Sequence, residues 1–363
     1  MRAGCGRNSG FLTGGADPAT LGDLASLSHR RTPFLALVGT PFATVLLIMR
    51  RRVLFAAFPA ALLASRAQAN PKRLDLAAFS SQTIAGTAAQ LFADKAGALS
   101  ARPFQIEVAE LPPMIPFAAI AKASALASFP APIFSRDEPV LGLSAVPMLA
   151  ATFDEAATLL HVARPYYAAA LARHGQILLA VEPWRPAALW STFRVRSGGD
   201  LRGARFALDE TVYTGEGWAE LFTRAGAQRS SYSEAEMTLS SGYTSSTMLA
   251  REFACVTEIF FATQLTFLTA SREAFESLTD AQGEDLLAIG RTTEAQLWRE
   301  IRPFVQRDQQ EAASRGVVVA AEPPADLVTA LRKAAEPDVR RWAAAMGADG
   351  VTILADYRRT LGF

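Results

Sequence analysis

The sequence predicts an α/β protein with a mostly parallel sheet, because short apolar strands alternate with amphipathic helices along the chain. A second observation is a helical pattern from residue 280 to residue 314, opened by a capping box at Thr279 and Gln282. Roughly 35 residues at about 1.5 Å each make a helix of about 50 Å, which exceeds the width of a small domain. We therefore expect two lobes with this helix lying across both.

An export signal is predicted at residues 49–69. Three arginines, Arg50 to Arg52, precede an apolar run that is too short to span a bilayer, and residues 67–69 (AQA) form a signal-peptidase site. We therefore expect a periplasmic protein whose mature chain begins at Asn70. Residues 1–48 read as a disordered leader or as a mis-assigned start before Met49, and a membrane segment at residues 34–48 is the alternative.

The mature chain carries a slight excess of acidic residues. Removing residues 1–69 takes away eight arginines and two acids, which leaves 28 Lys and Arg against 33 Asp and Glu, a net charge near −5. A protein that binds nucleic acid needs a basic face, so we expect no nucleic-acid partner. The remaining length suffices for one large domain or for two lobes of ordinary size.

The first half of the mature chain opens with a strand, a helix and a second strand. Residues 73–79 and 103–110 place apolar side chains at every second position, as half-buried strands do. Residues 83–96 have an apolar face at helical spacing and end at Gly97, a suitable helix stop. We further expect helices at 118–127 and 153–174, a connection at 129–137, a strand and turn at 140–148, and a strand at 177–181.

The second half continues the alternation. Pro303 lies inside the long helical pattern and predicts a kink, because proline removes one backbone hydrogen bond. Gly316 follows the end of that pattern, where a left-handed residue commonly terminates a helix. We expect strands at 191–196, 204–208, 254–259, 265–269 and 317–320, and helices at 216–225, 233–240, 273–278 and 325–346.

Three motifs, taken in order, resemble those of the solute-binding receptors of tripartite ATP-independent periplasmic (TRAP) transporters. They are residues 153–156 (FDEA), 199–208 (GDLRGARFAL) and 274–282 (AFESLTDAQ). Each motif is weak alone, but the three stand in the family's order and at similar spacing, behind an export signal. The resemblance covers most of the mature chain.

The resemblance implies a two-lobed periplasmic-binding-protein-like fold of type II, with a ligand cleft between the lobes. Lobe 1 is expected at residues 70–190 and lobe 2 at residues 191–262, while residues 263–363 supply the return strand, the spanning helix and the C-terminal helices. The resemblance further implies that the protein captures a small polar solute, an organic acid or a related molecule. The solute would be delivered to the membrane permease subunits of a TRAP transporter.

Two arginines are candidates for the ligand site that the resemblance implies. The family clamps a substrate carboxylate with an arginine of the second motif, but Ala207 occupies that position here and cannot hold an anion. Arg205 lies on the same face of the strand, about 6.7 Å away, and either replaces the clamp or is a solvated surface residue. Arg185 matches a second family arginine, and Trp184 beside it offers an aromatic wall. The alternative is a surface arginine stacked on a partly buried tryptophan.

Polar residues at two strand ends complete the predicted ligand site. Ser81 and Gln82 stand between the first strand and the first helix, where backbone N–H groups either hold an anion or only cap the helix. Glu210 and Tyr213 follow the strand that ends at residue 208, and their groups suit an amine, a polyol or a hydroxylated acid. The family's polar ligand loop is replaced by residues 242–247 (GYTSST). The predicted site therefore comprises Ser81, Gln82, Trp184, Arg185, Arg205, Glu210 and Tyr213.

The sequence contains no motif of a known catalytic site. HExxH, GxSxG, P-loop and CxxC patterns are all missing, so we expect a protein that is not an enzyme and needs no metal or cofactor. One alternative keeps the fold without transport: Ala207 and the replaced loop suit a degenerate receptor that acts as a sensor or scaffold. An exported hydrolase is the weakest alternative, because no nucleophile–base pair is visible.

Overall fold

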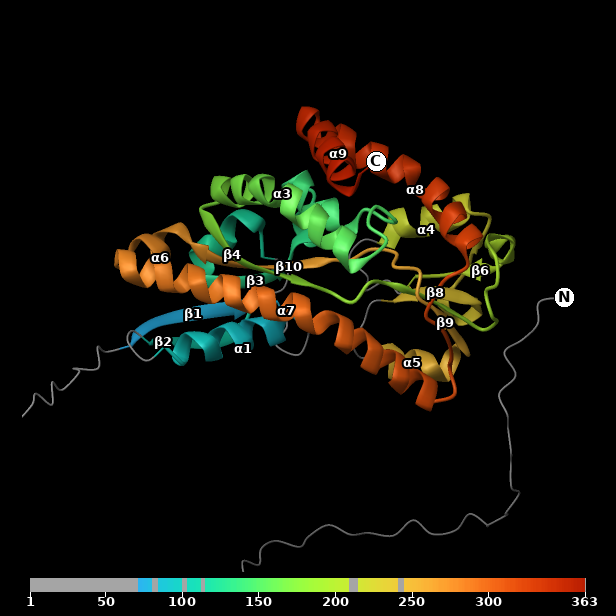
Figure 1. Ribbon diagram of the computed structural model, residues 1–363, viewed down its shortest axis with the longest axis horizontal. Helices are drawn as coiled ribbons and strands as arrows, with labels where there is room; N and C mark the ends of the chain where they lie inside the picture. The colour runs from blue at the N-terminus through green and yellow to red at the C-terminus, as the bar shows by residue number, and fades with distance from the viewer. Residues whose placement is uncertain are drawn as a thin grey trace, which may run out of the picture. The chain divides into compact units, whose positions relative to one another are not determined.

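The computed structural model describes residues 71–79, 84–99, 103–111, 115–208, 215–240 and 245–362. Figure 1 shows these residues as two groups of strands with helices packed against them. The leader at residues 1–48 and the export signal at residues 49–69 lie outside the described residues, so both stay predictions. Across the described chain, no helix is both long enough and apolar enough to cross a membrane.

The first sheet has five strands in the order β2-β1-β3-β10-β4. β1 (Lys72–Ala78) pairs in parallel with β2 (Phe104–Glu110) and with β3 (Leu126–Pro130). β10 (Leu265–Ser271) pairs antiparallel with both β3 and β4 (Gln176–Pro183). A strand from the second half of the chain therefore lies between two strands of the first half.

The second sheet has six strands in the order β11-β9-β5-β8-β6-β7. β5 pairs antiparallel with both of its neighbours, β8 and β9. The other pairs are parallel: β11 with β9, and β6 with β7 and β8. Both sheets are thus mixed, but most of their strands run in the same direction, as predicted: among the described strands, β10 in the first sheet and β5 in the second are the ones that run antiparallel to their neighbours. The strands are β5 (Ala188–Ser191), β6 (Arg205–Phe206), β7 (Gln228–Arg229), β8 (Met237–Ser240), β9 (Cys255–Thr257) and β11 (Val318–Ala320).

Helices cover both faces of the first sheet (Figure 1). On one face, α1 (Ile84–Gly97) and α7 (Asp280–Ser314) pack on alternate strand residues such as Leu76 and Leu268. On the other face, α3 (Phe153–Arg173) and α9 (Ala348–Leu361) enclose a second apolar cluster. β3 and β10 are buried along their whole length and β4 along most of it, as expected for strands covered on both faces, whereas β2 at the edge of the sheet alternates between exposed and less exposed residues.

The long helix α7 is confirmed, together with its capping box. Thr279 Oγ1 accepts a hydrogen bond from the backbone N of Gln282, and the Gln282 side chain accepts one from the backbone N of Thr279. The helix packs against α1 and β4 of the first sheet and against β11 and α5 (Ser245–Glu252) of the second. One helix therefore spans both lobes, as predicted, and it stays continuous through Pro303.

Gly290 sets how closely α7 approaches the first sheet. A Cβ atom at this position would lie 2.3 Å from the carbonyl oxygen of Leu179 in β4. No real Cβ atom comes that close to an oxygen, so glycine is the residue that permits this contact. Gly316 has a φ of +83°, which places it in the left-handed region expected after the end of the helix.

The second sheet has its own helical cover. α4 (Gly215–Arg224) and α8 (Ala325–Met346) enclose an apolar cluster built on residues such as Phe206 and Leu239. α5 and the end of α7 cover another cluster that contains Trp190. The remaining helices are the 3₁₀ turns Phe117–Ala119, Ala131–Phe134, Pro139–Ala145, Gly198–Leu201 and Tyr232–Glu234, and the short helices α2 (Ile120–Ala123) and α6 (Arg272–Glu276).

Several element predictions are wrong. Residues 118–127 form a turn, the short α2 and the start of β3, because the small apolar residues of a fully buried strand resemble those of a helix. Residues 140–148 contain a 3₁₀ turn instead of a strand. Residues 233–240 end in β8, and the strand expected at 191–196 stops at Ser191.

Candidate functional site

Three segments that link the two sheets meet around Arg185. The chain passes from β4 to β5 through residues 184–187, and from β9 to β10 through residues 258–264, while α7 runs beside both sheets. Arg185 belongs to the first of these segments, Glu258 to the second and Asp308 to α7. We call these three residues the crossing triad.

The crossing triad is a buried cluster of charges. Arg185 Nη2 donates to Glu258 Oε1 at 2.6 Å, and Arg185 Nη1 donates to the carbonyl oxygen of Pro186 at 3.2 Å. Arg185 Nε lies 2.7 Å from Asp308 Oδ2, an ion pair whose N–H direction falls outside that of a hydrogen bond. The side chains of Arg185 and Asp308 are only 3% and 7% exposed. The guanidinium of Arg185 is therefore already engaged by protein oxygens.

Burial and charge act in opposite directions on Glu258. Burial raises the pKa of this carboxyl group, while the charge of Arg185 and a hydrogen bond from Gln309 lower it by smaller amounts. The net pKa is above the ordinary value of a glutamate. Arg185 therefore offsets part of the effect of burial on the pKa of Glu258.

Trp184, predicted to form an aromatic wall of the site, is half-buried. Its indole Nε1 donates to Thr266 Oγ1 in β10 at 2.6 Å, which fixes the orientation of the ring. Thr266 stands opposite Glu182 in the ladder between β10 and β4. Trp184 and Arg185 are adjacent in sequence, but their side chains have different partners. Arg185 contacts Glu258 and Asp308, whereas Trp184 contacts Thr266 of β10.

Glu182 is a buried acid that the sequence analysis missed. It is 4% exposed, and its Oε2 atom has no hydrogen-bond partner among the described residues. Burial raises the pKa of this carboxyl group well above its ordinary value. The signal was available, because Glu182 is the only charged residue in the apolar run of residues 177–183 (ILLAVEP).

Arg205 lies at the surface of the second lobe. Its side chain is 51% exposed, Nε donates to the carbonyl oxygen of Glu234 at 2.7 Å, and Nη2 lies 3.6 Å from Glu236. Ala207, two residues later, is 7% exposed. The structure thus places the two residues in different surroundings, a solvated ion pair for Arg205 and a buried position for Ala207.

The remaining predicted site residues cannot be placed. Ser81, Gln82, Glu210 and Tyr213 all lie outside the described residues, and so does the first half, residues 242–244, of the segment that replaces the family's ligand loop. The ligand roles of all seven predicted residues therefore stay predictions. In the described chain, no group of three or more His, Cys, Asp or Glu side chains is arranged to hold a metal ion.

A wide surface hollow of about 620 Å³ lies elsewhere, between α2, the end of α3 and α6. Of the predicted site residues that the structure describes, Trp184, Arg185 and Arg205, none lines it, but Arg173 and His174 do. Both side chains bind the carboxylate of Glu138, with Arg173 Nε and His174 Nε2 each 3.0 Å from Oε1. The hydrogen bond from Arg173 is the main reason why the pKa of Glu138 is lowered. The positive charge of Arg173 is thus partly neutralised by the protein itself.

Comparison with known proteins gives a consistent result at the level of the fold. No protein-family model and no curated protein sequence matches the chain. Among solved structures, it is similar to DctP7 of Bordetella pertussis, an extracytoplasmic solute receptor binding pyroglutamic acid, with 21% identity and a TM-score of 0.66. That match covers 79% of this chain and 99% of the receptor.

Two further structures extend the comparison. A marine metagenome TRAP solute-binding protein, specific for pyroglutamate, has 18% identity and a TM-score of 0.65, and the match covers 80% of this chain and 99% of the other. TeaA, the ectoine-binding protein of the TeaABC TRAP transporter, has 13% identity and a TM-score of 0.69, over 81% and 99% of the two chains. The fold of this protein is therefore that of the TRAP-transporter solute receptors.

Proposed function

We propose that this protein is a periplasmic solute receptor that captures a small polar solute and delivers it to the permease subunits of a TRAP transporter. The observation that carries the proposal is the architecture: two mixed α/β sheets, two strand crossings and one helix spanning both lobes. This architecture extends over almost the full length of several receptors with this role. Those receptors bind pyroglutamate or ectoine, so small organic acids and related molecules are the first candidates for this chain.

The proposed mechanism is closure of the two lobes on the solute. In a receptor of this kind, the solute shifts the equilibrium from the open to the closed state by an amount set by its higher affinity for the closed state. The crossing triad suits this mechanism, because it ties together three segments that link the lobes and so defines where they can bend. Trp184, Arg205, Ser81, Gln82, Glu210 and Tyr213 are the proposed ligand contacts, with Arg185 either as a contact or as support for Trp184.

A thermal-shift screen tests the proposal directly. The panel contains pyroglutamate, ectoine, short hydroxy acids, amines and sugars, each added to the purified protein. A solute present at a hundred times its dissociation constant stabilises the folded state by about 2.7 kcal/mol, which raises Tm by several degrees. Export is part of the same proposal, and periplasmic protein that still began at Met1 or Met49 would contradict it.

A second candidate function is a receptor that has lost transport and serves as a sensor or scaffold. The observation that favours it is the buried Ala207 at the position where the family holds its carboxylate. If no member of the panel shifts Tm, and the protein still folds cooperatively, this candidate replaces the first. Genes for permease subunits beside the gene of this protein would favour transport.

A further inference from the structure

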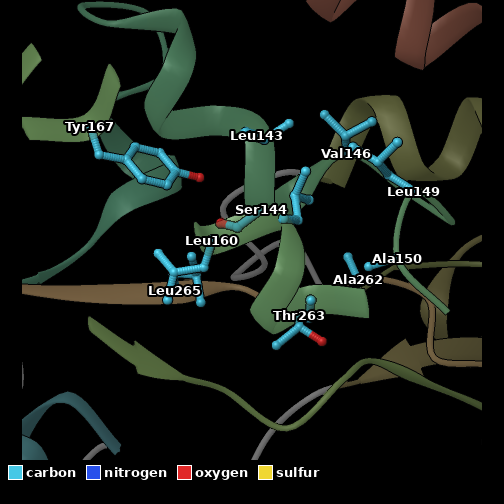
Figure 2. A pocket seen from close by; sticks show the side chains of 12 residues that line it. Leu143, Ser144, Val146, Leu149, Ala150, Leu160, Tyr167, Ala262, Thr263 and Leu265 are labelled. Carbon is cyan, nitrogen blue, oxygen red and sulfur yellow. The ribbon is translucent and has the colours of Figure 1, made fainter. Parts of the chain in front are cut away.

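A small internal cavity lies between the 3₁₀ turn Pro139–Ala145, helix α3 and residues 262–265 of the second crossing (Figure 2). It offers about 20 Å³ of room for the centre of a water molecule. A cavity needs about 10–15 Å³ on this measure to hold one water. The cavity therefore has room for a water molecule.

Most of the cavity wall is apolar, but three hydroxyl-bearing residues belong to it. Ser144 and Thr263 are 8% and 5% exposed, and among the described residues neither hydroxyl has a hydrogen-bond partner. Tyr167 of α3 is 1% exposed and lines the same cavity. Polar groups without partners are uncommon inside proteins, and ordered water is the usual way in which such groups are satisfied.

The arrangement of two of these hydroxyls is the strongest observation. Figure 2 shows the Tyr167 hydroxyl and the Ser144 hydroxyl pointing toward one another. They are not bonded directly, because the Ser144 oxygen has no partner in the described chain. Two hydroxyls that point toward one another without a direct bond, and that line a cavity with room for a water molecule, have the arrangement of a water bridge.

We propose that this cavity is a hydration site in which one internal water molecule bridges the hydroxyl groups of Ser144 and Tyr167. The water accepts from one hydroxyl and donates to the other, whereas the Thr263 hydroxyl points away from this pair and takes no part in the bridge (Figure 2). The water joins the 3₁₀ turn before α3 to the body of α3, beside the crossing that leads into β10.

A crystal structure at about 1.5 Å resolution tests the proposal. We expect a compact density peak in the cavity, about 2.6–3.2 Å from both Ser144 Oγ and Tyr167 Oη. A well-ordered cavity without such a peak would overturn the proposal.

The sign of a stability change provides a second test. Tyr167→Phe keeps the ring and removes only the hydroxyl. If that hydroxyl binds a water, the variant loses a hydrogen bond and its Tm falls by roughly 2–4 °C. If the hydroxyl is buried without a partner, removing it leaves Tm unchanged or raises it, and the proposal fails.

Thr293→Val is the matched control. The Thr293 hydroxyl is also buried without a partner in the described chain, but the cavity beside it has no room for a water centre. We expect this variant to keep or raise Tm. A Tyr167→Phe variant that behaved like Thr293→Val would show that the first cavity is dry.

Discussion

Glu182 carries a carboxyl group that folding removes from water without a cation beside it in the described chain. Because burial raises its pKa, the folded state holds a proton that the unfolded chain releases above about pH 4.3. The stability of the natural protein is then fully present below that pH and falls as the pH rises toward the folded-state pKa. Glu182→Gln does not titrate, so we expect its advantage over the natural protein to grow from pH 4 to pH 8. Urea unfolding of both proteins across this range measures the difference.

Glu138→Gln is the control, because its effect on stability should change with pH in the opposite direction to that of Glu182→Gln. The pKa of Glu138 is lowered, chiefly by the hydrogen bond from Arg173, so its contribution to stability is present above the unfolded pKa. That contribution is lost as the pH falls through the folded-state pKa. The natural protein should therefore exceed Glu138→Gln at neutral pH and lose this advantage in acid. Parallel pH profiles for the two variants would contradict both pKa assignments.

The crossing triad holds separate elements together, because its three side chains come from two strand connections and from α7. A surface arginine, the alternative that the sequence left open for Arg185, could be removed with little loss of stability, but Arg185 is buried between Glu258 and Asp308. Arg185→Met leaves two buried carboxyl groups without their cation, and such a change costs about 3–5 kcal/mol. Denaturant titration measures the loss in free energy of unfolding.

Two further variants separate charge from packing at the crossing triad. Adding Glu258→Gln and Asp308→Asn to Arg185→Met removes the uncompensated charges, and we expect most of the lost stability to return. Arg205→Met breaks a half-exposed ion pair with Glu236 and should cost less than about 1 kcal/mol. If Arg185→Met were as mild as Arg205→Met, the crossing triad would not hold the linking segments together.

Across the whole molecule, the sequence predicts those helices whose ends are marked by local sequence patterns. The capping box and Gly316 locate both ends of α7, and the predicted span 325–346 coincides with α8. The sequence does not identify β3 as a strand, because a strand buried on both faces lacks the alternation of apolar and polar residues. All five residues of β3 are buried. The ion pair between Arg185 and Glu258 could not be predicted for a related reason: the two residues are 73 positions apart, and no local pattern reveals their pairing.

The last prediction concerns the carboxylate clamp that the whole fold would place between its lobes. If Ala207 marks its loss, short monocarboxylates bind the natural protein poorly, and Ala207→Arg should tighten them by about tenfold or more through a two-pronged ion pair. The new side chain must find room at a position that is 7% exposed, so a modest loss of stability is also expected. Calorimetry with a panel of short acids measures both proteins, with Arg205→Ala as the matched control. Tight binding by the natural protein that Arg205→Ala abolished would instead show that Arg205 has taken over the clamp from its exposed position.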